Sequence, residues 1–402
     1  MMSSTFLDRT TPPHILTLVL ATATNALAMN VFLPSLPAIA RHFQADYSVV
    51  QLAVSLYLGA TAVLQLFIGP ASDRFGRRPV MLTCFSFFLV GSVATLYAPT
   101  IEMMLVARVM QAFSAAGVVL SRAIVRDTVS AANAASRMGY ITMGMAVVPM
   151  IGPAIGGILD ELYGWQAAFL LTLGFGCIAI TFVFLDLGET NNARSSSLTE
   201  QFNRYPELFR SRRFWGYTLT AGFTSGTFFA FLGGAPFIAS EMLGMRPSEY
   251  GLYFGLITLG YILGNFLTAR FTGRLGINRM MSAGAFVSLS AVCICYVVLS
   301  SGHMSPPGFF SPMFLIGLGN GLTLPNANAG IVSVRPKLAG SAAGLGGALQ
   351  VGCGATMSMI AGAMLGQDTG PWPLLEVMVV SSALAVLAGL YVIRVARQAG
   401  DI

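Results

Sequence analysis

Long runs of hydrophobic residues, separated by short polar stretches, recur along the whole chain. Each run is close to the ~20 residues that a helix needs to cross the hydrocarbon core of a bilayer. We therefore predict twelve membrane-spanning helices, at about residues 14–36, 48–68, 80–98, 101–124, 137–159, 165–185, 214–239, 250–269, 280–300, 308–331, 340–365 and 373–395. The longest polar stretch lies between the sixth and seventh runs. The pattern predicts an all-α membrane protein of two six-helix bundles, 1–185 and 214–402, joined by a cytoplasmic linker at 186–213.

The composition indicates a protein that is largely covered by lipid. Hydrophobic residues make up 55% of the chain and charged residues only 9%, whereas soluble domains carry about 25% charged residues. So few charges cannot cover a water-exposed surface. The net charge of +6 does not indicate a nucleic-acid partner, because the basic residues lie in short loops between the hydrophobic runs.

The basic residues also orient the chain. With the N-terminus in the cytoplasm, 19 of the 22 Lys and Arg residues fall on the cytoplasmic side. Arg41 and Arg246 fall outside, and Arg108 lies within a span. An excess of Lys and Arg in cytoplasmic loops is typical of membrane proteins. We therefore predict that both termini are cytoplasmic.

The loop between the second and third predicted spans, Gly69–Pro79, contains four charges, two glycines and two prolines. We call it the signature loop. Asp73 begins the third span, where a helix N-terminus favours negative charge, and Arg77 can reach the inner end of the fourth span. We predict that this cluster holds the two bundles together on the cytoplasmic side when the protein opens outward; the simpler alternative is that its arginines only anchor the loop at the membrane. The residues of this gating motif are Gly69, Asp73, Arg74, Gly76, Arg77, Arg78 and Asp127.

A partial copy of the signature loop follows the eighth predicted span. Gly273-Arg274-Leu275-Gly276 repeats Asp73-Arg74-Phe75-Gly76 at an offset of 200 residues. Two parallel halves related by an axis along the membrane normal are a known way to build a transporter. The repeat therefore favours a transporter made of two related halves.

Arg108 is the one basic residue placed inside a predicted span and away from its ends. A cation there needs a partner, because its burial in the bilayer is costly. The helix rise per residue, counted from the span ends, places Asn30 roughly 22 Å from the inner edge of the membrane and Arg108 at a similar depth. We predict that Asn30 is a hydrogen-bond partner of Arg108 and that the two mark the coupling region. The alternative is that backbone carbonyls bind the arginine for structural reasons.

Polar and aromatic residues at mid-depth are candidates for substrate contacts. Pro325 predicts a break in the tenth span, and broken helices often line a transport site. Together these side chains describe a mostly apolar cavity suited to a neutral or weakly polar drug-like molecule. The candidates are Asn25, Asn30, Tyr57, Gln111, Phe228, Phe231, Tyr253, Tyr261, Asn326 and Gln350.

Three motifs in these segments resemble those of the major facilitator superfamily. Gly69-x-x-x-Asp73-Arg74-x-Gly76-Arg77-Arg78 resembles its signature loop, and Arg108-x-x-Gln111 resembles its second motif. The fifth span resembles the motif of the superfamily's drug:proton antiporters, and residues 29–39 of the first span resemble the Bcr/CflA drug exporters, which include chloramphenicol and florfenicol exporters. The antiporter-motif residues are Gly144, Pro149, Gly152, Pro153, Gly156 and Gly157.

The resemblance implies a multi-pass protein of the bacterial inner membrane that exports small lipophilic antibiotics, with phenicols as candidates. It implies exchange for protons by alternating access, and we expect a monomer. Two residues depart from the family: Ala112 stands where the second motif usually has a glycine, and relatives usually carry Asp where this chain has Asn30. The second departure bears on the proton site. Coupling then uses another group, or Asn30 is a substitution that holds one conformation.

Two other functions stay open. The same fold could serve as an uptake carrier for a small anionic metabolite whose charge pairs with Arg108. A membrane sensor or enzyme would need an acid/base or metal constellation within the spans, and the sequence shows none. The chain also has no nucleotide-binding loop, and its histidines lie at span ends or in loops. We therefore expect no enzymatic activity, no cofactor and no metal.

Overall fold

The computed structural model describes residues 6–128, 141, 148–149, 151–191, 205–335, 338–366 and 368–398. Within these ranges the secondary structure is helical and contains no β-strand. Nine helical segments among the described residues are long and apolar enough to cross a membrane, the first being Ile15–Phe43 and the last Trp372–Gln398. The fold is that of a helical membrane transporter.

Residues 6–191 form the first group of helices. The first span is interrupted after Asn30 by a 3-10 turn that contains Pro34, and a second short helix continues it to Phe43. The elements of the first group are α1 (Ile15–Asn30), η1 (Leu33–Ser35), α2 (Leu36–Phe43), α3 (Tyr47–Val50), α4 (Leu52–Phe75), α5 (Arg77–Leu96), α6 (Ile101–Gln111), η2 (Ala112–Ser114), α7 (Ala115–Thr128), a helix at residues 151–163, and α9 (Gln166–Asp186).

Residues 205–398 form the second group. Its elements are α11 (Tyr205–Phe209), α12 (Arg212–Phe237), the π-helical turn η3 (Ile238–Met242), α13 (Pro247–Leu275), α14 (Ile277–Ser300), α15 (Pro306–Phe310), α16 (Met313–Ser333), α17 (Ala339–Met364) and α18 (Trp372–Gln398). The predicted spans overlap these helices, and residues 137–140, 142–147 and 150 of the fifth span lie outside the described residues.

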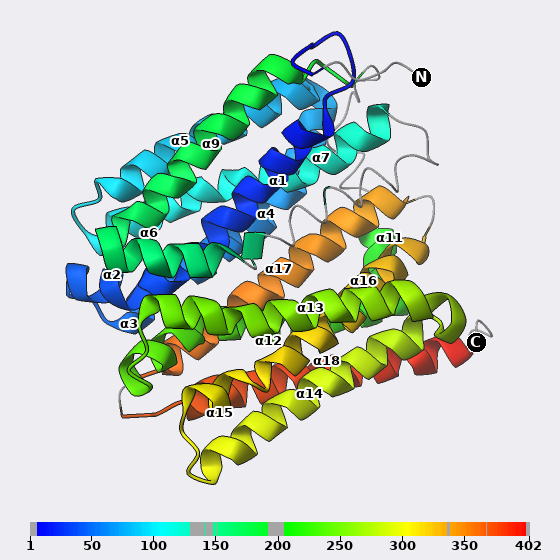
Figure 1. Cartoon of the computed structure of the whole chain (residues 1–402). Coiled ribbons are helices and arrows are strands. Elements are labelled where there is room, and N and C mark those ends of the chain that lie inside the picture. The colour runs from blue at the N-terminus through cyan, green and yellow to red at the C-terminus, as the bar shows by residue number, and fades with distance from the viewer. Residues whose placement is uncertain are drawn as a thin grey trace.

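Figure 1 shows the two groups as separate layers of helices, with α4 and α17 near the boundary between them. In the first group α1 packs against α7 and α9, and in the second α12 packs against α17 and α18. The main contact between the groups is that of α4 with α17. The limits of the linker, 186–213, stay a prediction, because residues 192–204 lie outside the described residues.

The repeated loops have the same backbone geometry. Gly76 ends α4 with φ 104° and ψ 154°, and Gly276 ends α13 with φ 81° and ψ 154°. Both angles lie in a region that glycine enters at little cost. Each glycine lets one span stop and the next begin after a single residue, so the two halves turn at the membrane edge in the same way.

The predicted break of the tenth span at Pro325 is wrong. Helix α16 continues through Pro325 to Ser333. Proline has no N–H, so it leaves the carbonyl four residues earlier without its helical donor. The Thr268 hydroxyl of α13 donates to that carbonyl, on Gly321, at 2.9 Å. A neighbouring side chain therefore replaces the lost hydrogen bond, and the interruption of this span lies between α15 and α16 instead.

Candidate functional site

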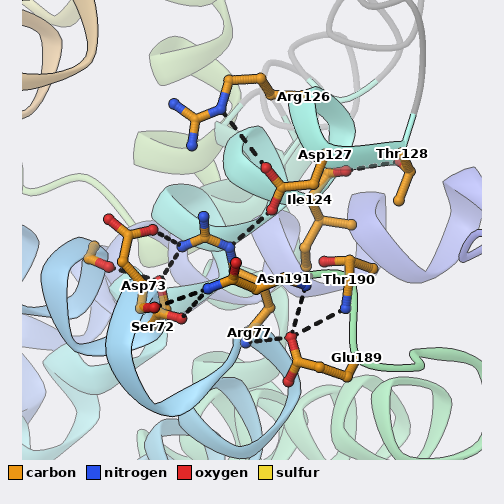
Figure 2. Close-up of polar contacts among 11 residues, drawn as sticks. Ser72, Asp73, Arg77, Ile124, Arg126, Asp127, Thr128, Glu189, Thr190 and Asn191 are labelled. Carbon is orange, nitrogen blue, oxygen red and sulfur yellow. Dashed lines mark hydrogen bonds and ion pairs between the residues drawn. The ribbon is translucent and has the colours of Figure 1, made fainter. Parts of the chain in front are cut away.

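The guanidinium of Arg77 is the centre of a charge cluster beneath the signature loop (Figure 2). Its Nη1 lies 2.6 Å from Asp73 Oδ1, and its Nε donates to Asp127 Oδ2 at 2.9 Å. It also donates to the Ser72 hydroxyl. Arg77 is almost fully buried, so these acceptors replace most of the hydrogen bonds that its guanidinium would otherwise make to water. The cluster joins the end of α4, the start of α5 and the end of α7.

The predicted linker begins with a second set of contacts to the same loop. Glu189 accepts the backbone N–H of Arg77 at 2.9 Å, and so caps the first turn of α5. Asn191 donates to the backbone oxygen of Asp73 at 2.9 Å (Figure 2). A carboxylate at a helix N-terminus is stabilised by the free N–H groups and the helix dipole. The sequence analysis missed Glu189 and Asn191, because they lie more than 110 residues from the loop.

The other two arginines of the loop have different roles. Arg78 donates to the backbone oxygen of Phe184 at 3.2 Å and lies over that ring, while Arg74 lies over the Phe75 ring. All these partners belong to the first group. In this structure the signature loop therefore stabilises the first group and the start of the linker, and its role as a link between the two groups stays a prediction for another conformation.

Arg108 lies inside the first group with none of its surface exposed. Its Nε donates to the backbone oxygen of Ala53 at 3.2 Å, and its Nη1 donates to that of Ala28 at 3.1 Å and to Gln111 Oε1. The guanidinium lies 4.1 Å from the centre of the Phe32 ring and 4.6 Å from that of Tyr57. Carbonyl dipoles and ring faces therefore stabilise this cation, as the structural alternative predicted.

The predicted hydrogen bond between Asn30 and Arg108 is wrong in this structure. The Asn30 amide nitrogen donates to the backbone oxygen of Ala26 at 2.7 Å, within its own helix. Asn30 Oδ1 and Arg108 Nη2 are both buried without a hydrogen-bond partner. Matching depth predicted their proximity along the membrane normal, but a free Asn side chain at a helix end can bond the carbonyl four residues before it.

Several of the predicted substrate residues form one polar network in the first group. The Tyr57 hydroxyl lies 2.9 Å from both Asn25 Oδ1 and the Ser114 hydroxyl. Gln111, which binds Arg108, donates to the Ser92 hydroxyl at 3.0 Å. Asn25 is the half-buried member of this network. Tyr57 and Gln111 are fully buried, so they position Asn25 and Arg108 rather than present a surface of their own.

The predicted aromatic residues gather in the second group. Phe231 lies 6.1 Å from Phe254 between ring centres, and Phe254 in turn lies 6.5 Å from Phe228. Tyr253 lies 5.2 Å from Phe310. Phe231 is fully buried, whereas Phe228 and Tyr253 are partly exposed. These two rings are therefore the ones at the edge of the cluster that can contact a substrate.

The remaining candidates lie elsewhere in the second group. The Asn326 amide accepts from the Thr272 hydroxyl at 3.0 Å, near the C-terminal end of α13. Tyr261 accepts at its backbone oxygen from Asn265. Gln350 of α17 donates to the Ser225 hydroxyl at 2.8 Å. The ten candidates therefore do not form one connected group of contacts.

Two glycines of the antiporter motif lie against the first span. A Cβ on Gly156 would lie closer than 3.0 Å to the backbone oxygen of Val31, and one on Gly152 would touch the Asn30 side chain at 3.8 Å. The motif therefore brings the fifth span against the interrupted part of the first. Pro149 is helical and half-buried, and Gly144 lies outside the described residues.

The next part of the motif contacts the second group. A Cβ on Gly157 would collide with the backbone of Pro247, and one on Gly251 would collide with Pro153 and Ala154. Small residues let two helices approach to backbone contact. The helix at residues 151–163 and α13 meet in this way at the end of the molecule that the orientation predicts to be outer.

Four polar contacts between described residues join the two groups at this end, and we call them the outer seam. Each uses one residue of the first group and one of the second. They are Tyr47 to the Gly233 oxygen (2.8 Å), Gln51 to Ser358 (2.7 Å), Arg41 to Glu241 (3.5 Å) and the Ser248 N–H to Glu161 (2.9 Å). The contact at Ser248 places the Glu161 carboxylate on the N-terminus of α13. This hydrogen bond lowers the pKa of Glu161. The outer ends of the two groups are therefore closed against each other.

A buried carboxylate anchors the opposite end of the first group. Asp186, fully buried, accepts from the Thr17 hydroxyl at 2.6 Å and from the backbone N–H groups of His14 and Leu7 at 2.8 and 2.9 Å. Elsewhere in the described ranges, too, the carboxylates lie in loops or within about five residues of a helix end. The middle of the described spans thus contains one buried cation, Arg108, without a carboxylate beside it.

Comparison with known proteins gives consistent matches. The model of the Major Facilitator Superfamily matches residues 18–351 and 235–400. The chain is similar to multidrug resistance protein D of Escherichia coli (strain K12), at 28% identity over 378 residues, 94% of each chain. It is also similar to a chloramphenicol resistance protein of Pseudomonas aeruginosa, at 30% identity over 302 residues, 73% of this chain and 70% of the relative.

Solved structures share the fold. The human organic anion transporter MFSD10 matches with a TM-score of 0.71 at 19% identity, over 94% of this chain and 98% of that one. The xylose transporter XylE of E. coli, in a partially occluded inward-open conformation, matches with a TM-score of 0.72 at 11% identity, over 94% and 96%. Their different substrates show that this fold alone does not determine the cargo.

Proposed function

The chain belongs to the major facilitator superfamily, and we propose that it exports small lipophilic antibiotics across a bacterial inner membrane by alternating access. Relatives that match most of the chain are a multidrug resistance protein and a chloramphenicol resistance protein, which supports drug export. Phenicols are the first substrates to test. The energy source we propose is exchange for protons.

The observation that supports a neutral substrate is the distribution of charged side chains within the described spans. The described spans hold no carboxylate in their middle, and the buried Arg108 is enclosed by carbonyls and by the rings of Phe32 and Tyr57. A cationic drug would find no buried counter-ion, and an anionic one would have to displace this enclosure. The partly exposed candidates are Asn25, Phe228, Tyr253, Tyr261 and Gln350, all of them uncharged. A neutral, mostly apolar molecule fits these groups best.

The outer seam supports alternating access. Closure of the two groups at their outer ends leaves a substrate path to one side of the membrane at a time, which is how transporters of two related halves work. The glycines of the antiporter motif form part of this closure through Gly157 and Gly251. The motif is thus placed where it would act on the conformational change.

Proton exchange needs a titratable group that is accessible first from one side of the membrane and then from the other. Asn30 cannot supply one, and in this structure it does not bind Arg108. We propose that Asn30→Asp restores a titratable partner for Arg108, because the unpaired Asn30 Oδ1 and Arg108 Nη2 are an acceptor and a donor of matching type.

The test is transport by purified protein in liposomes. Chloramphenicol movement is measured with an imposed pH gradient, for the native chain and for Asn30→Asp. A parallel susceptibility panel in a pump-deficient host identifies which drugs are exported by each form. If neither form moves drug in response to the gradient, proton exchange is refuted. If the native chain confers resistance without responding to the gradient, export stands and its energy source is different.

A second function, uptake of a small anionic metabolite, rests on Arg108. The direction of flux in whole cells separates it from export. The enclosure of Arg108 by backbone oxygens and aromatic rings favours export, because this cation is already stabilised without a bound anion.

A further inference from the structure

Gln51 is a polar side chain of the first group that lies inside the second. It occupies the turn between α3 and α4 and has none of its surface exposed. Its Nε2 donates to the backbone oxygen of Ser358 at 2.8 Å and to the Ser358 hydroxyl at 2.7 Å. Its Oε1 accepts from the Ser55 hydroxyl at 3.1 Å. The buried amide is therefore hydrogen-bonded at both ends.

The second group leaves a hole that fits this amide. A Cβ on Gly233 of α12 would lie closer than 3.0 Å to Gln51 Nε2, and a Cβ on Gly362 of α17 would lie closer than 3.0 Å to Gln51 Oε1. Real Cβ atoms essentially never approach another atom this closely, so a side chain at either glycine would force a neighbour to move. Any side chain at either position would collide with the amide while the outer seam is closed.

Tyr47, one helical turn before Gln51, makes a second contact with the same place. Its hydroxyl donates to the backbone oxygen of Gly233 at 2.8 Å. Its ring lies 4.8 Å from that of Phe237, also on α12. Two neighbouring side chains of the first group thus enter one site formed by small residues of the second.

We propose that Gln51, seated between Gly233 and Gly362, is the positioning residue that holds the outer side of this transporter closed, and that it leaves this hole each time the protein opens outward. The proposal rests on the proposed alternating-access function. A neutral amide suits this task, because its hydrogen bonds inside the protein are exchanged for similar bonds to water at a small net cost. The contact also contains no titratable group, unlike the Glu161 contact of the same seam.

The closed state can be monitored through Cys353. This cysteine lies on α17, about 7–8 Å along the helix from Ser358 towards the cytoplasmic end, and its side chain is half-buried. On this proposal, access to it from the outer side is blocked while Gln51 occupies its hole. A membrane-impermeant maleimide is added to intact cells, and labelling of Cys353 is measured by peptide mass spectrometry, with detergent-unfolded protein as the full-labelling reference.

Four forms are compared with the native chain. Gln51→Ala removes the amide, and Gly362→Ala places a methyl group against it. The double variant Gln51→Ala/Gly362→Ala removes the collision, and Gly344→Ala is the matched control on α17, where a Cβ meets nothing within 4 Å. We expect outside labelling of Cys353 to rise roughly tenfold in each of the first two, the effect of one or two neutral hydrogen bonds. The control should match the native chain.

The double variant is the decisive measurement. If Gly362→Ala acts by colliding with Gln51, it adds no labelling once Gln51 is Ala. Equal effects of Gly362→Ala in both backgrounds overturn the proposal, and so does native-level labelling in Gln51→Ala. Labelling that follows the expected pattern, in a protein that confers no drug resistance, leaves the lock in place and refutes the proposed export.

Discussion

The charge cluster of the signature loop makes a quantitative prediction about the stability of the first group. In this structure Arg77 binds Asp73 and Asp127 and is itself buried. Replacing it with Met leaves Asp73 without its cation and leaves Asp127 with only the exposed Arg126, whose Nε lies 3.7 Å from Asp127 Oδ1. Asp127 is the more affected, because it lies in the last turn of α7, where the helix dipole already disfavours negative charge.

The size of the effect follows from burial. Removing one partner of a buried ion pair costs about 3–5 kcal/mol. The Asp127 and Asp73 side chains remain 18% and 31% exposed, so water compensates part of that loss. We therefore expect Arg77→Met to destabilise the protein by about 2–3 kcal/mol and the coupling energy between Arg77 and Asp127 to be about 2 kcal/mol.

The measurement is a double-mutant cycle in detergent. The free energies of unfolding of Arg77→Met, Asp127→Asn and the double variant are compared with that of the native chain. Arg74→Met is the control, because Arg74 is exposed and lies only over the Phe75 ring. A surface change of this kind is expected to stay within about 0.5 kcal/mol.

Additive effects of Arg77→Met and Asp127→Asn would refute this reasoning. They would mean that the two side chains act independently and that the arginines only anchor the loop at the membrane. A strong coupling energy together with normal drug export would instead separate the two roles, with the cluster needed for stability but not for the transport cycle.

Two further predictions concern the outer end. Gly156→Ala should impair folding or transport, because the new methyl group meets the backbone oxygen of Val31, which cannot rotate away; Gly174→Ala, where a Cβ meets nothing within 4 Å, should be silent in the same expression and export assays. The Glu161 carboxylate has a lowered pKa because it accepts the Ser248 N–H, so its contribution to closure is present above the ordinary Glu pKa and lost as the pH falls through the lowered one. Outside labelling, expressed relative to unfolded protein labelled at the same pH, should therefore rise in acid in the native chain and rise less in Glu161→Gln.

The sequence predicted the spans well because each hydrophobic run matches the bilayer thickness. It also placed Arg77 near Asp127, since a short loop between two spans leaves its charges little freedom. The partners that come from distant segments of the chain could not be predicted from the sequence. Glu189 reaches the signature loop only because the chain returns there after four further spans, and no local pattern distinguishes it from any other loop carboxylate.

Gln51 illustrates a second limit. A Gln near the start of a span looks like an ordinary interface residue, and Gly233 and Gly362 look like ordinary small residues for helix contact. The role that we propose for these three residues follows from their proximity in the folded structure. The reverse error occurred at Asn30 and Arg108, where similar depth along the membrane normal predicted a hydrogen bond that this structure does not contain.

The distribution of carboxylates bears on how protons could drive export in this chain. In antiport through a mid-membrane carboxylate, proton and drug can compete for one site. Here the described spans offer no such group, and the titratable contact between the helix groups lies in the outer seam at Glu161. Protonation of Glu161, which its lowered pKa confines to acidic outer solution, would weaken the closed seam and favour outward opening, where drug leaves. Protons would then act on the conformational equilibrium rather than on the substrate site. Export driven in this way should show an outer-pH dependence that Glu161→Gln removes, with drug affinity unchanged.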